Sequence, residues 1–269
     1  MTSQSILIVG CGIAGPVLAS FLLLKDIPAQ QLPRITIVER ADCLRAQGQN
    51  IDIRGAGVTL MRKLGLETAI RSNTTGEEGA RWVDSKDRIW GQFAADKTGS
   101  VQTGTSDIEI LRGKLGQIFY DRSKTLSLEV KQKGGHGIEY IFGDYLESID
   151  QQGQEVLVRF AKSGEERRYD LVVGADGLQS RTRRMVFGEA GEKERVHNLG
   201  LYGGFYSMPK GGNDSEWRRW FHAPGGKGIM VRPSHDPKIT TVFMGYMTED
   251  KRYEEAGARE LGGVDKQRR

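Results

Sequence analysis

Ser5-Ile-Leu-Ile-Val-Gly-Cys-Gly-Ile-Ala-Gly15 is the stretch that decides the fold. Residues 5–9 form an unbroken apolar run rich in β-branched side chains, which is typical of a parallel strand buried on both faces. After the glycines, residues 16–25 predict a helix rich in leucine. A second apolar run at residues 35–39 ends in an acid, Glu39. Strand, glycine turn, helix and strand together predict a right-handed βαβ unit.

The glycines of this turn have the spacing that lets a backbone approach a diphosphate. Gly10 permits the tight turn, Gly12 allows the close approach, and Gly15 lets the helix pack on the strand. The start of the helix, including Ala14, offers unpaired amide groups and a partial positive charge. Glu39 would accept hydrogen bonds from a ribose diol and would repel a 2′-phosphate. The pattern predicts dinucleotide binding, and a glycine turn in an unrelated α/β protein is the alternative.

The rest of the chain predicts further elements on both sides of residue 190. Before it, we expect helices at 57–70 and 110–122, a hairpin at 80–93 and strands at 138–142, 156–160 and 169–174. Residues 138–142 and 156–160 flank polar turns, as in a small antiparallel insertion. From residue 199, short strands at 199–207, 217–222, 228–231 and 239–247 alternate with turn residues. They predict a separate antiparallel sheet.

The composition is that of an ordinary globular protein and argues against several classes of function. The 269 residues are 38% hydrophobic and 28% charged, and the net charge of +4 is too small for a general nucleic-acid surface. Two cysteines and four scattered histidines give no metal-ligand spacing and favour a reducing compartment. The longest apolar run, residues 17–24, is too short to cross a bilayer. The N-terminus lacks the pattern of a signal peptide, so we expect a cytoplasmic protein.

Four ordered segments carry a resemblance to a known family. They are residues 10–15 with Glu39-Arg40, residues 48–54 with the helix that follows, residues 109–115, and residues 170–177 with Ser180 and Arg183 or Arg184 after them. Together they resemble the flavoprotein monooxygenases with the p-hydroxybenzoate hydroxylase fold. The branch of greatest similarity contains tetracycline-inactivating monooxygenases and fungal biosynthetic enzymes. The resemblance extends over about residues 5–247 and is weaker after Arg184.

The resemblance implies a role for individual residues on either side of the cofactor. Glu39 and Arg40 would hold the adenosine end of FAD, and Arg45 would meet the nicotinamide cofactor. Asp52 would lie near the edge of the flavin ring, and Arg112 would reach the flavin side of the cofactor. Asp176 and Gly177 belong to a motif thought to serve both FAD and NADPH. With the turn residues Gly10, Gly12, Ala14 and Gly15, these positions form the predicted cofactor site.

Several of these residues have a purely structural alternative. Asp52 could cap a turn, and Arg112 could be an exposed helix arginine. Asp176-Gly177 could be an ordinary turn pair, although a buried strand precedes it. The aromatic residues Tyr202, Tyr206, Trp217 and Trp220 could line a substrate pocket, and packing within the sheet is the alternative for them.

The resemblance implies a division of the chain into domains and a particular reaction. The fold class is α/β: a Rossmann-like FAD/NAD(P)-binding domain at 1–190 with a hairpin insertion at about 80–104. A partial antiparallel substrate-binding sheet at 191–250 and a charged tail at 251–269 would follow. NADPH would bind transiently and reduce the flavin, and its C4a-hydroperoxide would transfer oxygen to a small organic substrate, aromatic or polyketide-like. No metal is expected, and no catalytic residue is identified.

One segment of the family pattern has no counterpart in this sequence. Residues 178–269 contain nothing like the Gly-Asp-Ala-Ala-His segment that closes over the flavin in such enzymes. The alternative hypothesis is therefore a truncated, non-catalytic nucleotide-binding remnant. The substrate, the choice between NADH and NADPH, and the oligomeric state are left open by the sequence.

Overall fold

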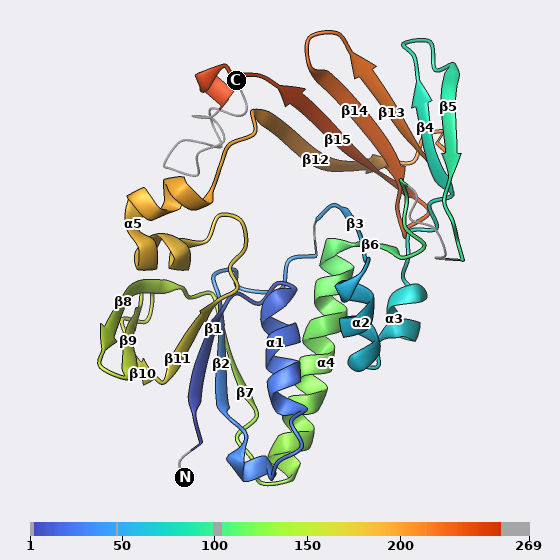
Figure 1. The fold of residues 1–269 in the computed structure, drawn as a ribbon. Helices are drawn as coiled ribbons and strands as arrows, with labels where there is room; N and C mark the ends of the chain where they lie inside the picture. Colours follow the sequence, from blue (N-terminus) through green and yellow to red (C-terminus); the bar gives the residue numbers. More distant parts are fainter. Residues whose placement is uncertain (1–2, 47, 99–103, 213, 254–269) are drawn as a thin grey trace. The chain divides into compact units, whose positions relative to one another are not determined.

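The computed structural model describes residues 3–46, 48–98, 104–212 and 214–253 (Figure 1). This part of the chain forms two compact units, each assembled from separate stretches of sequence. The first unit draws on Met1–Gly48, Ala56–Ile70 and Arg112–Val196. The second unit draws on Gln49–Gly55, Arg71–Leu111 and His197–Arg269. The chain therefore crosses between the units several times.

A four-stranded parallel sheet forms the centre of the first unit. Its strand order is β11-β1-β2-β7, and every neighbouring pair is parallel. The strands are β1 (Ser5–Val9), β2 (Arg34–Glu39), β7 (Ile138–Phe142) and β11 (Leu171–Gly174). Helix α1 (Ala14–Leu23) connects β1 to β2, with the short 3-10 helix η1 (Ala29–Gln31) before β2. The predicted βαβ unit and the α/β fold class are confirmed.

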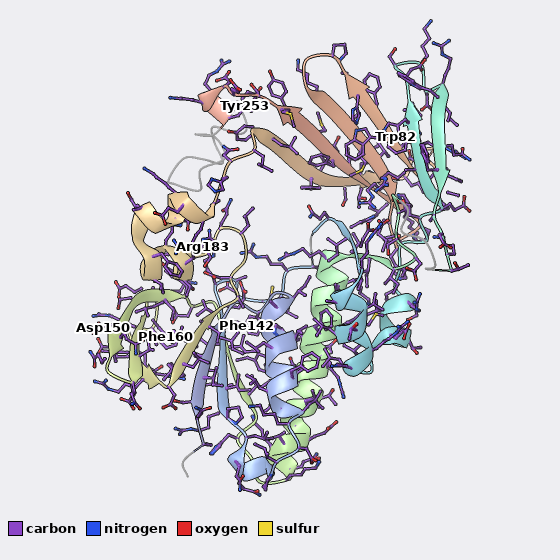
Figure 2. The ribbon with its side chains drawn as sticks, in the orientation of Figure 1. Trp82, Phe142, Asp150, Phe160, Arg183 and Tyr253 are labelled. Atoms are coloured by element: carbon purple, nitrogen blue, oxygen red, sulfur yellow. The ribbon has the colours of Figure 1, made fainter. Side chains whose placement is uncertain are left out.

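Different layers cover the two faces of this sheet. Ile6 and Ile8 of β1 pack with helices α1 and α4 (Arg112–Gln132) on one face. Leu7 and Val9 pack on the other face against a three-stranded antiparallel sheet, in which Phe160 is 1% exposed (Figure 2). That sheet has the order β10-β9-β8 and consists of β8 (Leu146–Gln152), β9 (Glu155–Phe160) and β10 (Glu166–Tyr169). Because successive side chains of β1 enter opposite layers, residues 6–9 all have to be apolar.

Three predicted elements differ from those in the structure. Residues 138–142 do not belong to an antiparallel insertion, because β7 pairs in parallel with β2. The predicted helix 57–70 is two helices, α2 (Ala56–Lys63) and α3 (Glu67–Arg71), separated at Gly65, whose φ of +70° favours glycine and ends a helix. Helix α4 begins at Arg112 rather than at residue 110, since β6 occupies the preceding residues. Helix α5 (Arg181–Arg195) completes the first unit.

The second unit is built on a six-stranded sheet of order β12-β15-β14-β13-β4-β5. Its strands are β4 (Gly79–Val83), β5 (Ile89–Ala94), β12 (Leu201–Pro209), β13 (Trp217–Ala223), β14 (Lys227–Pro233) and β15 (Ile239–Met247). The predicted antiparallel sheet after residue 199 is confirmed. The predicted hairpin also forms, and β4 extends the same sheet by pairing in parallel with β13.

A two-stranded ribbon, β3 (Asn50–Asp52) with β6 (Glu109–Leu111), completes the second unit. Residues 99–103 of the predicted insertion and 254–269 of the predicted tail lie outside the described residues. Within the described ranges, no helix has the length and apolar character needed to cross a membrane.

Candidate functional site

The turn between β1 and α1 requires glycine at two of its positions. Gly10 has φ of +114°, and its amide donates to the carbonyl of Val38 on β2 at 2.8 Å. A Cβ added at Gly10 would lie 2.5 Å from the carbonyl oxygen of Ala175, so the turn after β1 presses against the turn after β11. A Cβ at Gly15 would overlap the carbonyl oxygen of Gly10. The glycine spacing seen in the sequence therefore has a steric cause within the fold.

The N-terminus of α1 has neither a side-chain cap at Ile13 nor an acidic residue in its first turn. Ala14, the first helical residue, is exposed. Gly12 carries no side chain, and a Cβ built there would meet the Nη2 of Arg112 at 3.7 Å. The first amides of a helix have no partner within the helix and carry a partial positive charge, and with a nearby guanidinium this is the chemistry of a phosphate site.

Glu39 lies at the end of β2 with its carboxylate facing this turn. Its Oε2 accepts a hydrogen bond from the amide of Cys11 at 3.0 Å, and its Oε1 accepts one from the amide of Ala41 at 3.0 Å. These bonds fix the carboxylate while each oxygen keeps a lone pair for another donor. Burial, reinforced by the charge of Glu39, raises the pKa of the Cys11 thiol to about 12, so this thiol stays protonated. Arg40 and Arg45, which follow in the chain, are exposed.

Arg112 is brought to the glycine turn from a distant part of the sequence. It is the first residue of α4, and its side chain is close both to Gly12 and to Gly48, where an added Cβ would lie 2.8 Å from the Cβ of Arg112. A Cβ at Gly113 would overlap the carbonyl of Ala46, so the chain before β3 packs tightly on the start of α4. The structure thus brings together Gly12 and Arg112, two of the predicted cofactor residues.

Asp176 satisfies its carboxylate within its own turn. It accepts hydrogen bonds from the Oγ of Ser180 at 2.5 Å and from the amide and Oγ1 of Thr182 at 3.1 and 3.0 Å. These bonds anchor the start of α5, where Ser180 is the N-cap. Gly177 has φ of +82° and makes the turn possible. Asp176 therefore shapes the loop that abuts Gly10.

The remaining predicted residues belong to the second unit. Asp52, the last residue of β3, forms an ion pair with Arg54 at 2.9 Å. Residues paired across neighbouring strands have their side chains on the same face of a sheet. The register aligns Tyr206 of β12 with Val242 of β15 and continues through β14 to β13, and along these pairs Tyr206 and Trp217 are on one face of the six-stranded sheet. Trp220 is on the opposite face, so the four aromatic residues considered in the sequence do not share one surface.

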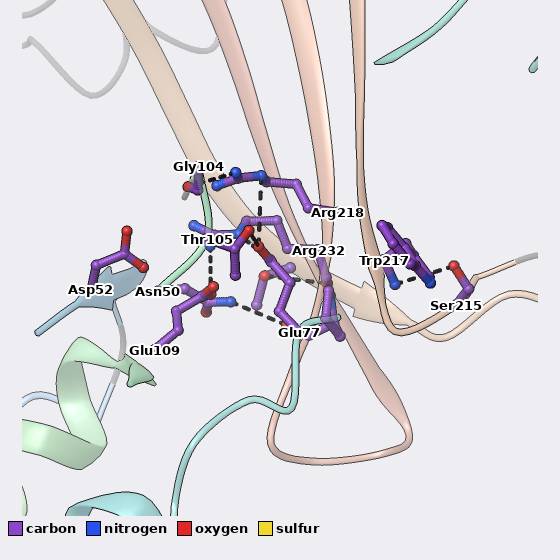
Figure 3. A network of polar contacts seen from close by, with 12 residues as sticks. Asn50, Asp52, Glu77, Gly104, Thr105, Glu109, Ser215, Trp217, Arg218 and Arg232 are labelled. Carbon is purple, nitrogen blue, oxygen red and sulfur yellow. Dashed lines mark hydrogen bonds and ion pairs between the residues drawn. The ribbon is translucent and has the colours of Figure 1, made fainter. Parts of the chain in front are cut away.

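A buried cluster of charges in the second unit was not predicted (Figure 3). Glu77 is 1% exposed and Glu109 is 2% exposed, and Arg232 of β14 lies between them. The Nε of Arg232 is 3.0 Å from Oε2 of Glu77, and its Nη2 is 2.5 Å from Oε1 of Glu109. Arg218 of β13 lies 3.6 Å from Glu77, to which Thr105 donates a hydrogen bond at 2.6 Å. No sequence spacing links these residues, although Glu109 begins a segment that was singled out for Arg112.

The fold and the turn together define a dinucleotide-binding protein of the Rossmann class. The chain matches the family model described as FAD binding domain over residues 3–261, and it belongs to this family. The predicted family resemblance is therefore confirmed.

Curated relatives and a solved structure extend the comparison. The chain is 35% identical over 252 residues to the FAD-dependent monooxygenase asL6 of Sarocladium schorii, covering 91% of this chain and 58% of that protein. It is 33% identical over 244 residues to the flavin-dependent monooxygenase eupH of Phoma sp, covering 89% and 53%. The crystal structure of tetracycline destructase Tet(51) superposes with a TM-score of 0.70 and 32% identity, covering 93% of this chain and 58% of that one. The chain thus spans little more than half the length of these relatives.

Proposed function

We propose that this chain binds FAD at the turn between β1 and α1 as part of a flavin-dependent monooxygenase. The observation that carries the proposal is the uncapped N-terminus of α1, with Glu39 beside it and Arg112 over Gly12. The amides of the turn would receive the diphosphate, Glu39 the ribose of the adenosine half, and Arg112 a phosphate oxygen. Arg40, Arg45, Asp52 and Gly177 are assigned to FAD or NADPH by family resemblance alone.

Bound flavin, once reduced, would supply the oxygen chemistry, and the residues of this chain would orient it and limit its contact with water. NADPH would be the transient reductant. The substrate would be a small organic molecule, aromatic or polyketide-like, as the family resemblance suggests. Support for a monooxygenase comes from the names of the relatives, which are FAD-dependent or flavin-dependent monooxygenases.

The absorption spectrum of the purified 269-residue chain, followed by titration with FAD, tests the proposal. We expect flavin absorbance, or saturable uptake of added FAD. NADPH consumption and peroxide release, measured with and without candidate substrates, then test the reaction. A colourless chain that takes up no FAD would overturn the proposed cofactor site. Uptake of FAD without any NADPH oxidation would overturn the proposed reaction for this chain.

Arg112→Ala is expected to weaken FAD binding about tenfold to hundredfold, because a charge-assisted hydrogen bond contributes about 1.5–3 kcal/mol. The matched control is Lys124→Ala, which removes one positive charge from the same helix near the ring of Tyr120. Isothermal titration with FAD measures both. Equal affinities in the two variants would show that Arg112 does not reach the cofactor.

Glu39→Ala is expected to weaken FAD binding by a similar factor of about ten to a hundred, because it removes a charged acceptor for the ribose hydroxyls. It also frees the amides of Cys11 and Ala41, so the turn loses its brace. Glu147→Ala, which removes an exposed carboxylate paired with Arg159 in the same unit, is the control. Quenching of flavin fluorescence measures the affinity for FAD. An unchanged affinity in Glu39→Ala would refute the assignment of Glu39 to the ribose.

A further inference from the structure

Several buried polar atoms around Glu109 have no hydrogen-bond partner among the described residues. Neither carboxyl oxygen of Glu109 accepts a hydrogen bond of ordinary geometry from the described chain, although Arg232 lies against Oε1. Oδ1 of Asn50 is also buried without a donor. The Nδ2 of Asn50 donates one hydrogen to the carbonyl oxygen of Pro233 at 3.1 Å, and its amide also lies close enough to Glu109 to favour the ionised carboxylate. A proton on Glu109 would add the donor that this part of the cluster lacks.

The neighbouring carboxylates also favour a proton on Glu109. Glu109 is directly opposite Asp52 in the antiparallel ribbon, a pairing that is unfavourable when both carboxylates are ionised. Glu77, from the segment before β4, adds a second buried carboxylate. Arg232 is the cation that reaches Glu109, and its Nε is already bound to Glu77.

The other cations near the cluster are engaged elsewhere. Arg218 donates to the carbonyl of Gly104 at 2.9 Å and faces Glu77. Lys97 donates to the backbone carbonyl of Glu77, and Arg54 pairs with Asp52. Arg218 and Arg54 therefore face carboxylates other than Glu109, and Lys97 donates to a neutral backbone carbonyl.

The pKa of Glu109 is raised to about 7 by this environment. Burial is the largest cause of the raised pKa, Arg232 and a hydrogen bond from Asn50 oppose it, and the negative charges of Glu77 and Asp52 reinforce it. A carboxyl whose pKa is higher in the folded state than in the open state stabilises the fold most at low pH. Its contribution falls as the pH rises from about 4.5 and is lost once the pH has passed about 7.

We propose that Glu109 takes up a proton as the pH falls from 8 to 6 and, with Arg232, acts as a positioning residue for the β3–β6 ribbon, to which Asp52 also belongs. The ribbon is thereby fixed to β14 by the contacts of Glu109 with Arg232 and of Asn50 with Pro233. The inference rests on the proposed function in one respect, which is that Asp52 is the residue of this ribbon assigned to the flavin.

Hydrogen exchange of the ribbon amides in the full 269-residue chain tests this, measured at pH 6 and pH 8 and corrected for intrinsic rates. With a folded-state pKa of about 7, protection of residues 50–52 and 109–111 should fall about tenfold between these pH values. Glu109→Gln keeps the shape and supplies a permanent N–H donor. Its protection should be at least as high as that of the unchanged chain at pH 6 and should vary less than twofold with pH. Glu109→Ala should lower protection at both pH values.

Glu147→Gln, which alters an exposed carboxylate of the first unit, is the matched control and should preserve the tenfold fall. Flat protection in the unchanged chain, or the same pH dependence in Glu109→Gln, would overturn the inference whether or not FAD binds. Failure of every variant to take up FAD, with the exchange pattern as expected, would instead overturn the proposed cofactor site and the role given to Asp52.

Discussion

Gly12→Ala is expected to abolish FAD uptake while leaving the chain folded. The added methyl group would meet the Nη2 of Arg112 at 3.7 Å, which is ordinary van der Waals contact, and Gly12 does not have a positive φ. The same methyl group would occupy the space that a diphosphate needs against the backbone. We expect affinity to fall by on the order of a hundredfold or more, with little change in the melting temperature.

Two other glycine variants serve as controls for Gly12→Ala, one expected to be neutral and one expected to disturb folding. Gly212→Ala, at a position with open space around it, should change neither FAD affinity nor stability. Gly15→Ala should disrupt the turn itself, because its Cβ would overlap the carbonyl oxygen of Gly10. FAD titration and thermal unfolding of the three variants separate binding from folding. If Gly12→Ala bound FAD within a few-fold of the unchanged chain, the diphosphate could not lie against this turn.

Arg232→Met is expected to destabilise the second unit by about 3–5 kcal/mol, since breaking a buried ion pair leaves an uncompensated charge. Methionine fills much of the same volume but leaves Glu77 and Glu109 without their shared cation. The four tryptophans, Trp82, Trp90, Trp217 and Trp220, all belong to the second unit. Their fluorescence during urea unfolding therefore reports this unit selectively.

An exposed ion pair of the same unit supplies the control for Arg232→Met. Arg88→Met removes a guanidinium whose side chain is 75% exposed and paired with Asp84, so the expected loss is below about 1 kcal/mol. Arg218→Met should give an intermediate value, because Arg218 lies 3.6 Å from Glu77 and donates to the carbonyl of Gly104. A loss in Arg232→Met no larger than that in Arg88→Met would mean that the cluster contributes little to stability.

Sequence reasoning succeeded where a local pattern has a local cause. The run from Ser5 to Gly15 encodes a strand, a turn and a helix through contacts between near neighbours, and each forms as predicted. The predictions were wrong where a strand pairs with residues far away in the sequence. Residues 138–142 have the composition of a strand, but nothing in them indicates whether they pair in parallel with β2 or with the next hairpin. Gly65 breaks the predicted helix 57–70, but the glycine alone does not predict the break, because hydrophobic residues continue on both sides of it.

The candidate site divides in the same way. Glu39 could be placed beside the turn because the ends of adjacent parallel strands meet at one edge of the sheet. The engagement of Asp176 by Ser180 and Thr182 depends on side-chain rotamers that the motif does not specify. Glu77, Glu109 and Arg232 are far apart in the sequence and meet through the strand pairing of the second unit, so no spacing could indicate their cluster.

The parallel pairing of β4 with β13 has a consequence for synthesis on the ribosome. The two strands are separated by roughly 130 residues, so β4 and β5 emerge long before the strand that completes their sheet. During that interval the edge of β4 that will pair with β13 has no neighbouring strand, and Trp82 and Phe93 of the hairpin are exposed as they are in the finished unit. The nascent chain should therefore be a good client for a chaperone that holds apolar hairpins until translation has passed Ala223.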